Sequence, residues 1–311
     1  MRILITGASG FIGRHLVAAL STAGHRIVCC VRDLERARRM FPAQMVVACD
    51  FTRAVDPELW LPRVRGVDAV INCAGILHAR DAESIAAIHR AAPKALFTAC
   101  LVAGVERVVQ LSALGVGSGA DSDYAHSKLA ADDYLQSLGL DWTILRPSVV
   151  YTEAGPAGCA SQFRTFATVP WFLPVVGTGE QTFQPIHMAD LAEAVRRVVE
   201  NGVGRRQVID AVGQEPVSLA ILLAEFRRRL GSPPARLVHL PLPLVRLIGR
   251  LGDRWGREPV TTAALTVMMR DNTADPQPFR EVTGITSRRF ADVFSDLSPV
   301  RGAPYDAGRQ G

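Results

Sequence analysis

Short apolar runs alternate with helix-like stretches along the first 150 residues of the chain. The apolar runs are bounded by glycine or polar residues and are rich in Val and Ile, which is typical of buried strands. Six of these runs predict strands: residues 2–6, 26–32, 45–50, 67–75, 107–113 and 141–147. Because continuous apolar strands alternate with helices, we expect an α/β fold with a doubly wound parallel sheet that is covered on both faces.

Two of the helix-like stretches carry informative residues. Residues 11–24 place apolar side chains on one helical face and end at Gly24, a residue that favours helix termination. The longer stretch of residues 82–104 contains Pro93. Proline lacks a backbone donor and clashes with the preceding turn, so a kink or a break is expected there.

The alternation fades after about residue 150, which indicates a second, smaller unit. Glycine, proline and threonine are frequent from there to about residue 185, and amphipathic helices are expected after that point. The resulting domain prediction has four parts: a large domain at 1–150, residues 187–215 packing back onto it, a small substrate or partner domain formed by 151–186 and 216–300, and a frayed polar tail at 301–311.

One apolar segment of the smaller unit is interrupted at regular intervals by arginine. Residues 241–256 carry Arg246, Arg250 and Arg254 among leucine, isoleucine and valine. This pattern fits a packing helix of a small domain. It also fits a peripheral helix that contacts a membrane or a protein partner, and both interpretations stay open.

Composition narrows the function classes. The chain has 311 residues, 48% of them hydrophobic, and a formal net charge of +5. Its arginines are spread along the sequence and form no long basic block. Nucleic-acid binding is therefore not indicated. The six cysteines form no C-x-x-C pair and no Cys/His ligand cluster, which predicts a reducing compartment and no metal. The first residues lack a signal peptide and no membrane span is recognised, so we expect a cytoplasmic protein.

A glycine-rich turn connects the first predicted strand to the first predicted helix. The segment TGASGFIGR (residues 6–14) contains Gly7, Gly10 and Gly13. Glycines at such a junction permit a tight turn and let the backbone approach a pyrophosphate, which the helix N-terminus attracts. The sequence therefore predicts a Rossmann-type dinucleotide-binding domain.

Several short segments resemble the short-chain dehydrogenase/reductase superfamily in its extended and atypical branch, which includes NAD-dependent epimerases and dehydratases. The segments are the G-x-x-G-x-x-G turn, INCAGI (71–76), YAHSK (124–128), LRPSVVY (145–151) and FQPIHMADLAEAV (183–195). The chain also resembles the NAD(P)H-binding group that contains an accessory subunit of respiratory complex I. The resemblance covers residues 1–200 well and the rest poorly.

The resemblance implies a set of cofactor-binding residues. They follow the carboxyl ends of the predicted strands, where such proteins hold their dinucleotide. The set comprises Gly7, Ser9, Gly10, Phe11, Ile12, Gly13, Arg32, Arg36, Asp50, Phe51, Cys73, Ala74, Gly75, Tyr124, Lys128, Pro147 and Val149.

The end of the second strand bears on the choice of dinucleotide. Val31 stands where an NAD-using relative would have an aspartate for the ribose 2′-hydroxyl, and Arg32 and Arg36 follow. A guanidinium can contact the 2′-phosphate of NADP with two hydrogen bonds, so NADP(H) is favoured over NAD(H). In the alternative interpretation, Arg32 is solvated and Asp33, one position displaced, binds the ribose.

Tyr124 and Lys128 are the candidate catalytic pair. The chain has four tyrosines and two lysines, so a Tyr-x-x-x-Lys match by chance is expected only about 0.03 times. Residues four apart share a helix face, and an ammonium near a phenol lowers its pKa from about 10 and makes it a better proton donor. Ser122 or Asp123 is expected to cap this helix. In the resembled family the lysine also bonds the nicotinamide ribose.

The family also has a hydroxyl residue after the fifth strand that polarises the substrate carbonyl. Here Ser112 is the candidate, but Ala113 and Leu114 follow it where relatives often carry further hydroxyls. Three functions therefore compete. The first is an NADPH-dependent oxidoreductase for a small-molecule carbonyl or hydroxyl. The second is a non-catalytic NADPH-binding structural, sensor or assembly subunit, and the third is a nucleotide-sugar epimerase or dehydratase.

Overall fold

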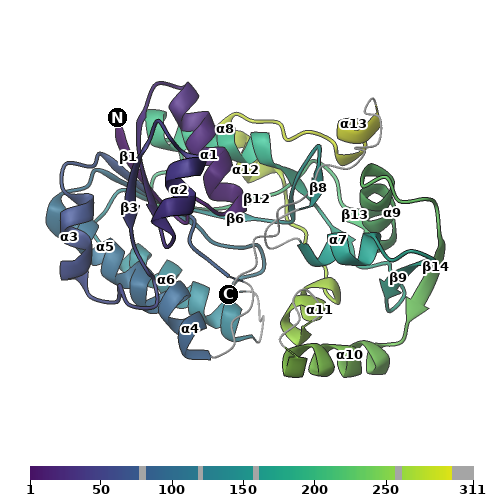
Figure 1. Cartoon of the computed structure of the whole chain (residues 1–311). Helices are drawn as coiled ribbons and strands as arrows, with labels where there is room; N and C mark the ends of the chain where they lie inside the picture. Colours follow the sequence, from purple (N-terminus) through teal and green to yellow (C-terminus); the bar gives the residue numbers. More distant parts are fainter. Residues whose placement is uncertain (77–81, 118–121, 157–160, 256–260, 296–311) are drawn as a thin grey trace.

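The computed structural model describes residues 1–76, 82–117, 122–156, 161–255 and 261–295. The polar tail predicted at 301–311 lies outside these ranges. Within them the chain forms a large α/β domain and a smaller domain beside it (Figure 1).

A seven-stranded parallel sheet forms the centre of the large domain, which confirms the predicted fold class (Figure 1). Its strands lie in the order β12-β6-β5-β4-β1-β2-β3. Their bounds are β1 Arg2–Thr6, β2 Arg26–Val31, β3 Met45–Ala48, β4 Ala69–Asn72, β5 Arg107–Leu111, β6 Trp142–Pro147 and β12 Gln207–Ala211. The strand order reverses between β1 and β4, and ligands of such sheets bind at the carboxyl ends of the strands next to that point.

Helices cover both faces of this sheet (Figure 1). One buried apolar cluster joins the sheet to α1 and α8, and a second joins the opposite face to α3, α5 and α6. The helices of this layer arrangement are α1 Phe11–Thr22, α2 Leu34–Met40, α3 Pro57–Val64, α4 Ala82–Ala86, α5 Ala92–Ala103, α6 Asp123–Ser137, α8 Met188–Asn201 and α12 Gln277–Thr283. Both faces are apolar because the central strands β1, β2, β4, β5 and β6 are buried on both sides, whereas the edge strands β3 and β12 are partly exposed.

The break expected near Pro93 is a π-helical turn. This turn, η1 (Ala87–Ala91), joins α4 to α5, and Pro93 lies in the first turn of α5, where its missing N–H costs little. The helical stretch Glu83–Ala103 is also long and apolar enough to cross a membrane by length and composition alone. Leu96, Phe97 and Cys100 of this stretch are fully buried against the sheet, as in a core helix.

The smaller domain encloses a third apolar cluster around Phe163, Phe183 and Phe226. Its helices are α7 Ser161–Ala167, α9 Leu219–Arg229, α10 Leu242–Trp255, α11 Thr262–Met268 and α13 Phe290–Ser295. Its short strands are β7 Val150–Thr152, β8 Gly155–Pro156, β9 Phe172–Val176, β10 Thr182–Phe183, β11 Ile186–His187, β13 Val217–Ser218 and β14 Arg236–Leu240.

Candidate active site

The glycine turn lies at the carboxyl end of β1 and leaves space for a ligand. Gly7 has a φ of +63°, and a Cβ there would lie 2.9 Å from the Ala74 backbone. A Cβ on Gly13 would lie only 2.2 Å from the Gly7 carbonyl oxygen. Gly10, the N-cap of α1, supplies no side-chain cap, and the first turn contains no acidic residue. The N–H groups at this helix end are therefore available to a pyrophosphate, and the turn fits a dinucleotide.

The end of β2 holds the residues of both interpretations of the ribose site. Val31 is buried, whereas Arg32 and Arg36 are exposed. The Asp33 carboxylate accepts a hydrogen bond of 3.0 Å from the Arg36 backbone N–H and caps α2. Asp33 therefore already has a structural role as the cap of α2, and the two arginine side chains lie on the surface beside it.

The residues expected near the adenine shape the turn after β3. Asp50 accepts hydrogen bonds from the N–H and the hydroxyl of Thr52, at 3.0 and 2.8 Å. Phe51 is buried with its ring against Trp60. The other expected cofactor residues occupy the turn and two strand ends: Ser9 is exposed, Phe11 and Ile12 are half-buried, Cys73 and Ala74 are half-buried, Gly75 is exposed, and Pro147 and Val149 are buried.

Helix α6 holds both members of the Tyr–Lys pair. The Ser122 side chain accepts a hydrogen bond of 3.1 Å from the Ala125 N–H, which caps the helix and places Tyr124 in its first turn. Lys128 is buried, and its Nζ donates to the Leu111 carbonyl oxygen at 2.8 Å. A Cβ on Gly75 would lie 3.7 Å from the same Nζ. The ammonium therefore lies between the end of β5 and the turn after β4.

His89 belongs to this site, although the sequence alone did not single it out. The π-helical turn directs it inward, where its Nε2 accepts a hydrogen bond of 3.0 Å from the Ile76 N–H. Its ring meets the Tyr124 ring edge-on at 5.1 Å between centroids. Because Nε2 accepts, the proton is on Nδ1, which lies 3.4 Å from Ser127 Oγ. A histidine in a largely apolar helical stretch that also contains Glu83, Arg90 and Lys94 was a weak signal for this role.

Burial and the charge of Lys128 lower the pKa of His89 to about 3. The native protein therefore keeps His89 neutral, while the unfolded chain takes up a proton below about pH 6.5. Native stability attributable to His89 is present above that pH and is lost as the pH falls toward 3, by about 1.4 kcal/mol per pH unit. We predict that urea unfolding at pH 6.5 and 5 shows a smaller pH-dependent loss in His89→Asn than in the wild type.

Two comparisons make that measurement specific. The lowered pKa values of His15 and His187 contribute to both proteins, so they cancel in the difference. His126→Asn, a substitution at an exposed position of α6, is the matched control. An equal loss of stability between pH 6.5 and 5 in the wild type and in His89→Asn would contradict the lowered pKa of His89.

Ser112 lies at the end of β5 but directs its hydroxyl into the protein. Its Oγ donates a hydrogen bond of 2.6 Å to the carboxylate of Asp132, a fully buried residue of α6. Burial raises the pKa of Asp132, while the Ser112 hydrogen bond and the nearby charges of Lys128 and Arg146 oppose that shift. The Ser112 hydroxyl therefore donates its hydrogen bond to Asp132, and in this arrangement it does not donate to a substrate carbonyl.

A buried polar chain extends from Asp132 to the glycine turn. Gln110 lies between Asp132 and Asn72, with contacts of 3.5 and 2.7 Å. Asn72 Oδ1 in turn accepts a bond of 2.5 Å from the Thr6 hydroxyl. These side chains connect the ends of β1, β4 and β5 to α6. The hydrogen-bonded network therefore links the Tyr–Lys helix to the cofactor turn.

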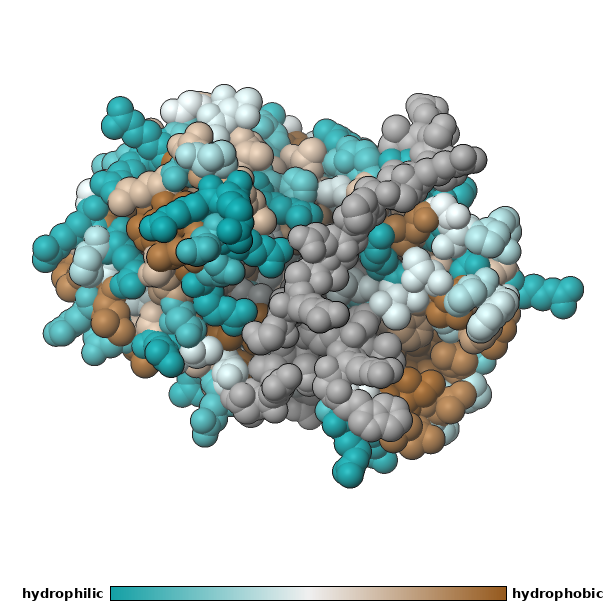
Figure 2. Space-filling view, viewed as in Figure 1, coloured by the Kyte–Doolittle hydropathy of each residue, from teal (hydrophilic) through white to brown (hydrophobic). Residues whose placement is uncertain are grey.

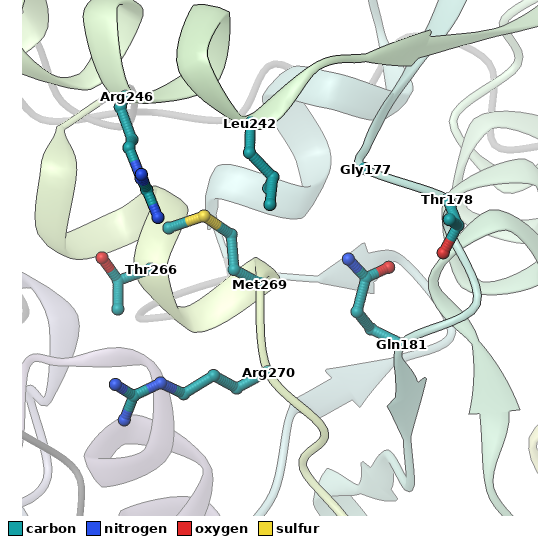
Figure 3. Close-up of a pocket in the computed structure, with 8 residues that line it drawn as sticks. All are labelled: Gly177, Thr178, Gln181, Leu242, Arg246, Thr266, Met269 and Arg270. Atoms are coloured by element: carbon teal, nitrogen blue, oxygen red, sulfur yellow. The ribbon is translucent and has the colours of Figure 1, made fainter.

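Two pockets lie beyond the strand ends. The first, of about 480 Å³, lies beside α6 and is lined by the loop after β5 (residues 114–117), Leu129, Arg146, Asp210 and the segment 271–273. The second, of about 410 Å³, belongs to the smaller domain; Figure 3 shows Arg246 entering it from α10, with Met269, Arg270 and Gln181 around it. In the ranges that the structure describes, no group of three His, Cys, Asp or Glu side chains could hold a metal ion.

A model of the NAD-dependent epimerase/dehydratase family matches residues 3–210. The chain belongs to this family. The matched segment spans the sheet from β1 to β12 and includes the glycine turn and the Tyr–Lys helix, so family membership rests on the elements that form the site.

Similar proteins of this family differ in the activities that their names state. The chain is 28% identical to ceramide reductase of Caulobacter vibrioides over 81% of its own length and 78% of that protein. It is 27% identical to the mitochondrial NADH dehydrogenase [ubiquinone] 1 alpha subcomplex subunit 9 of Arabidopsis thaliana, over 80% of the chain and 62% of that subunit.

Solved structures share the fold across almost the whole chain. MoeE5, in complex with UDP-glucuronic acid and NAD, is 23% identical, with a TM-score of 0.69 and coverage of 94% of this chain and 96% of that one. The NADPH-dependent quinone oxidoreductase QOR2 of Escherichia coli, complexed with NADPH, is 18% identical, with a TM-score of 0.69 and coverage of 94% and 98%. At these identities the likeness extends to the fold alone.

Proposed function

We propose that this protein is an NADPH-dependent oxidoreductase that acts on the carbonyl or hydroxyl group of a small molecule. The observation that carries the proposal is the placement of Tyr124 and Lys128 on α6, with Lys128 Nζ beside Gly75. Gly75 belongs to the turn after β4, and Ala74 of that turn abuts Gly7 of the glycine turn. The pair is thus held next to a cradle that fits a dinucleotide.

The bound cofactor supplies or accepts a hydride. The chain's own part is the movement of a proton, for which the Tyr124 phenol is the donor to a carbonyl oxygen or the acceptor in reverse. The Lys128 ammonium would favour the phenolate form of Tyr124 and would bind the ribose of the cofactor, as the lysine of the resembled family does. His89 holds one edge of the Tyr124 ring and ties the turn after β4 to α6. Ser112 is bonded to Asp132, so in this proposal Tyr124 polarises the carbonyl without a serine partner.

The proposed preference for NADPH rests on Arg32 and Arg36. Replacing a guanidinium that contacts a 2′-phosphate removes a charge-assisted interaction, and NADH lacks that phosphate. We predict that Arg32→Gln weakens NADPH binding by about 10- to 100-fold and changes NADH binding little. Calorimetric titration of both nucleotides measures the effect, with Arg39→Gln, which removes an exposed arginine from the last turn of α2, as the control. Equal losses for NADPH and NADH, or no loss for either, would refute the role of Arg32.

The substrate is proposed to occupy the pocket beside α6. That pocket is bordered by apolar and charged side chains. The apolar ones are Leu114, Val116 and Leu129, and the charged ones are Arg146, Asp210 and Asp271. The direct test is NADPH consumption with a panel of aldehydes, long-chain ketones and quinones, followed by identification of the alcohol or quinol formed. Long-chain ketones are included because ceramide reductase is similar to this chain in sequence, and quinones are included because the quinone oxidoreductase QOR2 shares its fold. Tight NADPH binding without consumption across the panel would refute the oxidoreductase proposal.

A second candidate function is a cofactor-binding subunit without turnover that docks to a membrane-associated partner. The Ser112–Asp132 hydrogen bond favours it, because the hydroxyl expected to polarise a carbonyl is engaged elsewhere. Similarity to a complex I subunit is consistent with this role. Nucleotide-sugar epimerase or dehydratase chemistry is a third candidate, which retained NAD would favour and which Arg32 disfavours. A nucleotide identified by mass in the purified protein distinguishes this third candidate from the other two.

A further inference from the structure

Helix α10 presents leucine side chains to solvent along one face. Leu244, Leu247 and Leu251 are 43%, 53% and 39% exposed, and their spacing of three and four residues places them in one stripe. In Figure 2, hydrophobic side chains gather at the lower right of the molecule, where Figure 1 shows α10 and β14. Adjacent exposed leucines of this kind mark an interaction surface more often than a bare protein surface.

The opposite face of α10 is fixed against α11. Val245 is buried, and a Cβ on Gly249 would lie 3.0 Å from the backbone and hydroxyl of Thr262. The carboxylate of Asp253 accepts hydrogen bonds from the Thr262 N–H and hydroxyl, at 3.0 and 2.6 Å. The helix therefore cannot turn its leucines inward without losing these contacts.

A basic stripe runs beside the leucine stripe. Arg250 and Arg254 are exposed one turn apart, and the side chain of Arg246 enters the neighbouring pocket (Figure 3). The single acidic residue of α10, Asp253, is bonded to α11, so the charge that this side of the helix offers is positive. Leucines flanked by arginines on one short helix fit the boundary between the headgroups and the acyl chains of an anionic bilayer.

Other exposed apolar side chains occur nearby in the same domain. Leu237 and Val238 of β14 are exposed, and Trp171, which directly precedes β9, is 83% exposed. Strands β14 and β9 pair with each other, so Leu237 and Val238 belong to a small sheet and Trp171 lies just before its second strand. Tryptophan is enriched at membrane interfaces because its ring is apolar and its N–H can bond water or headgroups.

We propose that α10 docks this protein on the surface of an anionic phospholipid membrane, with Leu244, Leu247 and Leu251 inserted and Arg250 and Arg254 against lipid phosphates. The inserted leucines supply the hydrophobic contribution, and the arginines supply selectivity for negative charge. This surface is independent of the Tyr124 site, so the proposal does not depend on catalytic turnover.

The test is co-sedimentation of the full chain with vesicles at low salt. Vesicles of phosphatidylglycerol and phosphatidylcholine in equal parts should bind the wild type, and vesicles of phosphatidylcholine alone should bind it at least about tenfold more weakly. The double variant Leu247→Gln/Leu251→Gln should lose at least about tenfold in binding, because two apolar side chains no longer insert. Arg250→Gln and Arg254→Gln should each lose about fivefold.

Leu59→Gln is the matched control, since Leu59 is 47% exposed on α3 of the large domain, and it should bind as the wild type does. If the double leucine variant does not fold, the single arginine variants still test the proposal. Their side chains are exposed, so the substitutions should leave the fold intact. No binding to anionic vesicles, equal binding to both vesicles, or equal binding by all variants would overturn the proposal. A wild-type dimer in light scattering that Leu247→Gln dissociates would also overturn it, because a second copy would then cover the leucines.

Discussion

Replacing Gly13 by alanine is expected to weaken NADPH binding by about a hundredfold or more. An added Cβ would lie 2.2 Å from the Gly7 carbonyl oxygen and 2.8 Å from Ala8 Cα, both of them backbone atoms. The turn and the helix must therefore separate by most of an ångström, and such a displacement in a binding site can cost about two orders of magnitude. Overpacking should also reduce the free energy of unfolding by about 1–3 kcal/mol. Calorimetric titration and urea unfolding measure the two effects.

Gly139→Ala is the control for that prediction. Nothing lies within 4 Å of a Cβ at Gly139, which is exposed after α6, so alanine should be accepted there without loss of cofactor binding. A Gly13→Ala protein that folds and binds NADPH with wild-type affinity would show that the glycine turn does not hold the cofactor.

Tyr124→Phe is expected to lower the rate of NADPH-dependent reduction by about 100- to 10,000-fold, with NADPH affinity nearly unchanged. The substitution keeps the ring that His89 contacts at 5.1 Å and removes only the hydroxyl. General acid–base groups contribute factors of this size when they transfer a proton in the transition state. Steady-state rates with the best substrate of the panel, together with NADPH titration, separate the loss of chemistry from the loss of binding.

The same helix provides a matched control. Tyr134 also lies on α6, and its hydroxyl is 2.8 Å from the Thr98 hydroxyl. Tyr134→Phe should therefore cost about 1 kcal/mol of stability and leave the rate intact. Similar rates in Tyr124→Phe and the wild type would instead favour a cofactor-binding protein whose observed activity arises elsewhere.

Local sequence patterns were sufficient for the sheet and for the cofactor turn. Each apolar run predicted a strand because parallel strands are buried on both faces. Gly7 directly follows β1, and Gly13 lies in the first turn of α1. The cap at Ser122 was also expected, because serine before a helix accepts from a first-turn N–H. These features depend on neighbours that are close in sequence.

The parts that could not be predicted depend on contacts between distant segments. His89 reaches Ile76 and Tyr124 through a π-helical turn, and nothing in the local sequence specifies that irregularity. The direction of the Ser112 hydroxyl is set by Asp132, which lies on another element. Asp132 is buried beside Ala131 and Leu135 on a helix with many polar residues, so the local sequence did not mark it as a buried carboxylate in need of partners.

Transfer of deuterium tests the central claim most directly, because it follows the hydride itself. The wild type is incubated with NADPH deuterated at C4 of the reduced nicotinamide ring, on one face at a time, and with the best aldehyde or ketone of the panel, because a quinol keeps no hydrogen on its former carbonyl carbon. The oxidoreductase proposal predicts one deuterium on the former carbonyl carbon of the product from one face of the ring, and none from the other. Unlabelled product from both labelled forms, or no product from any carbonyl tested, would contradict it.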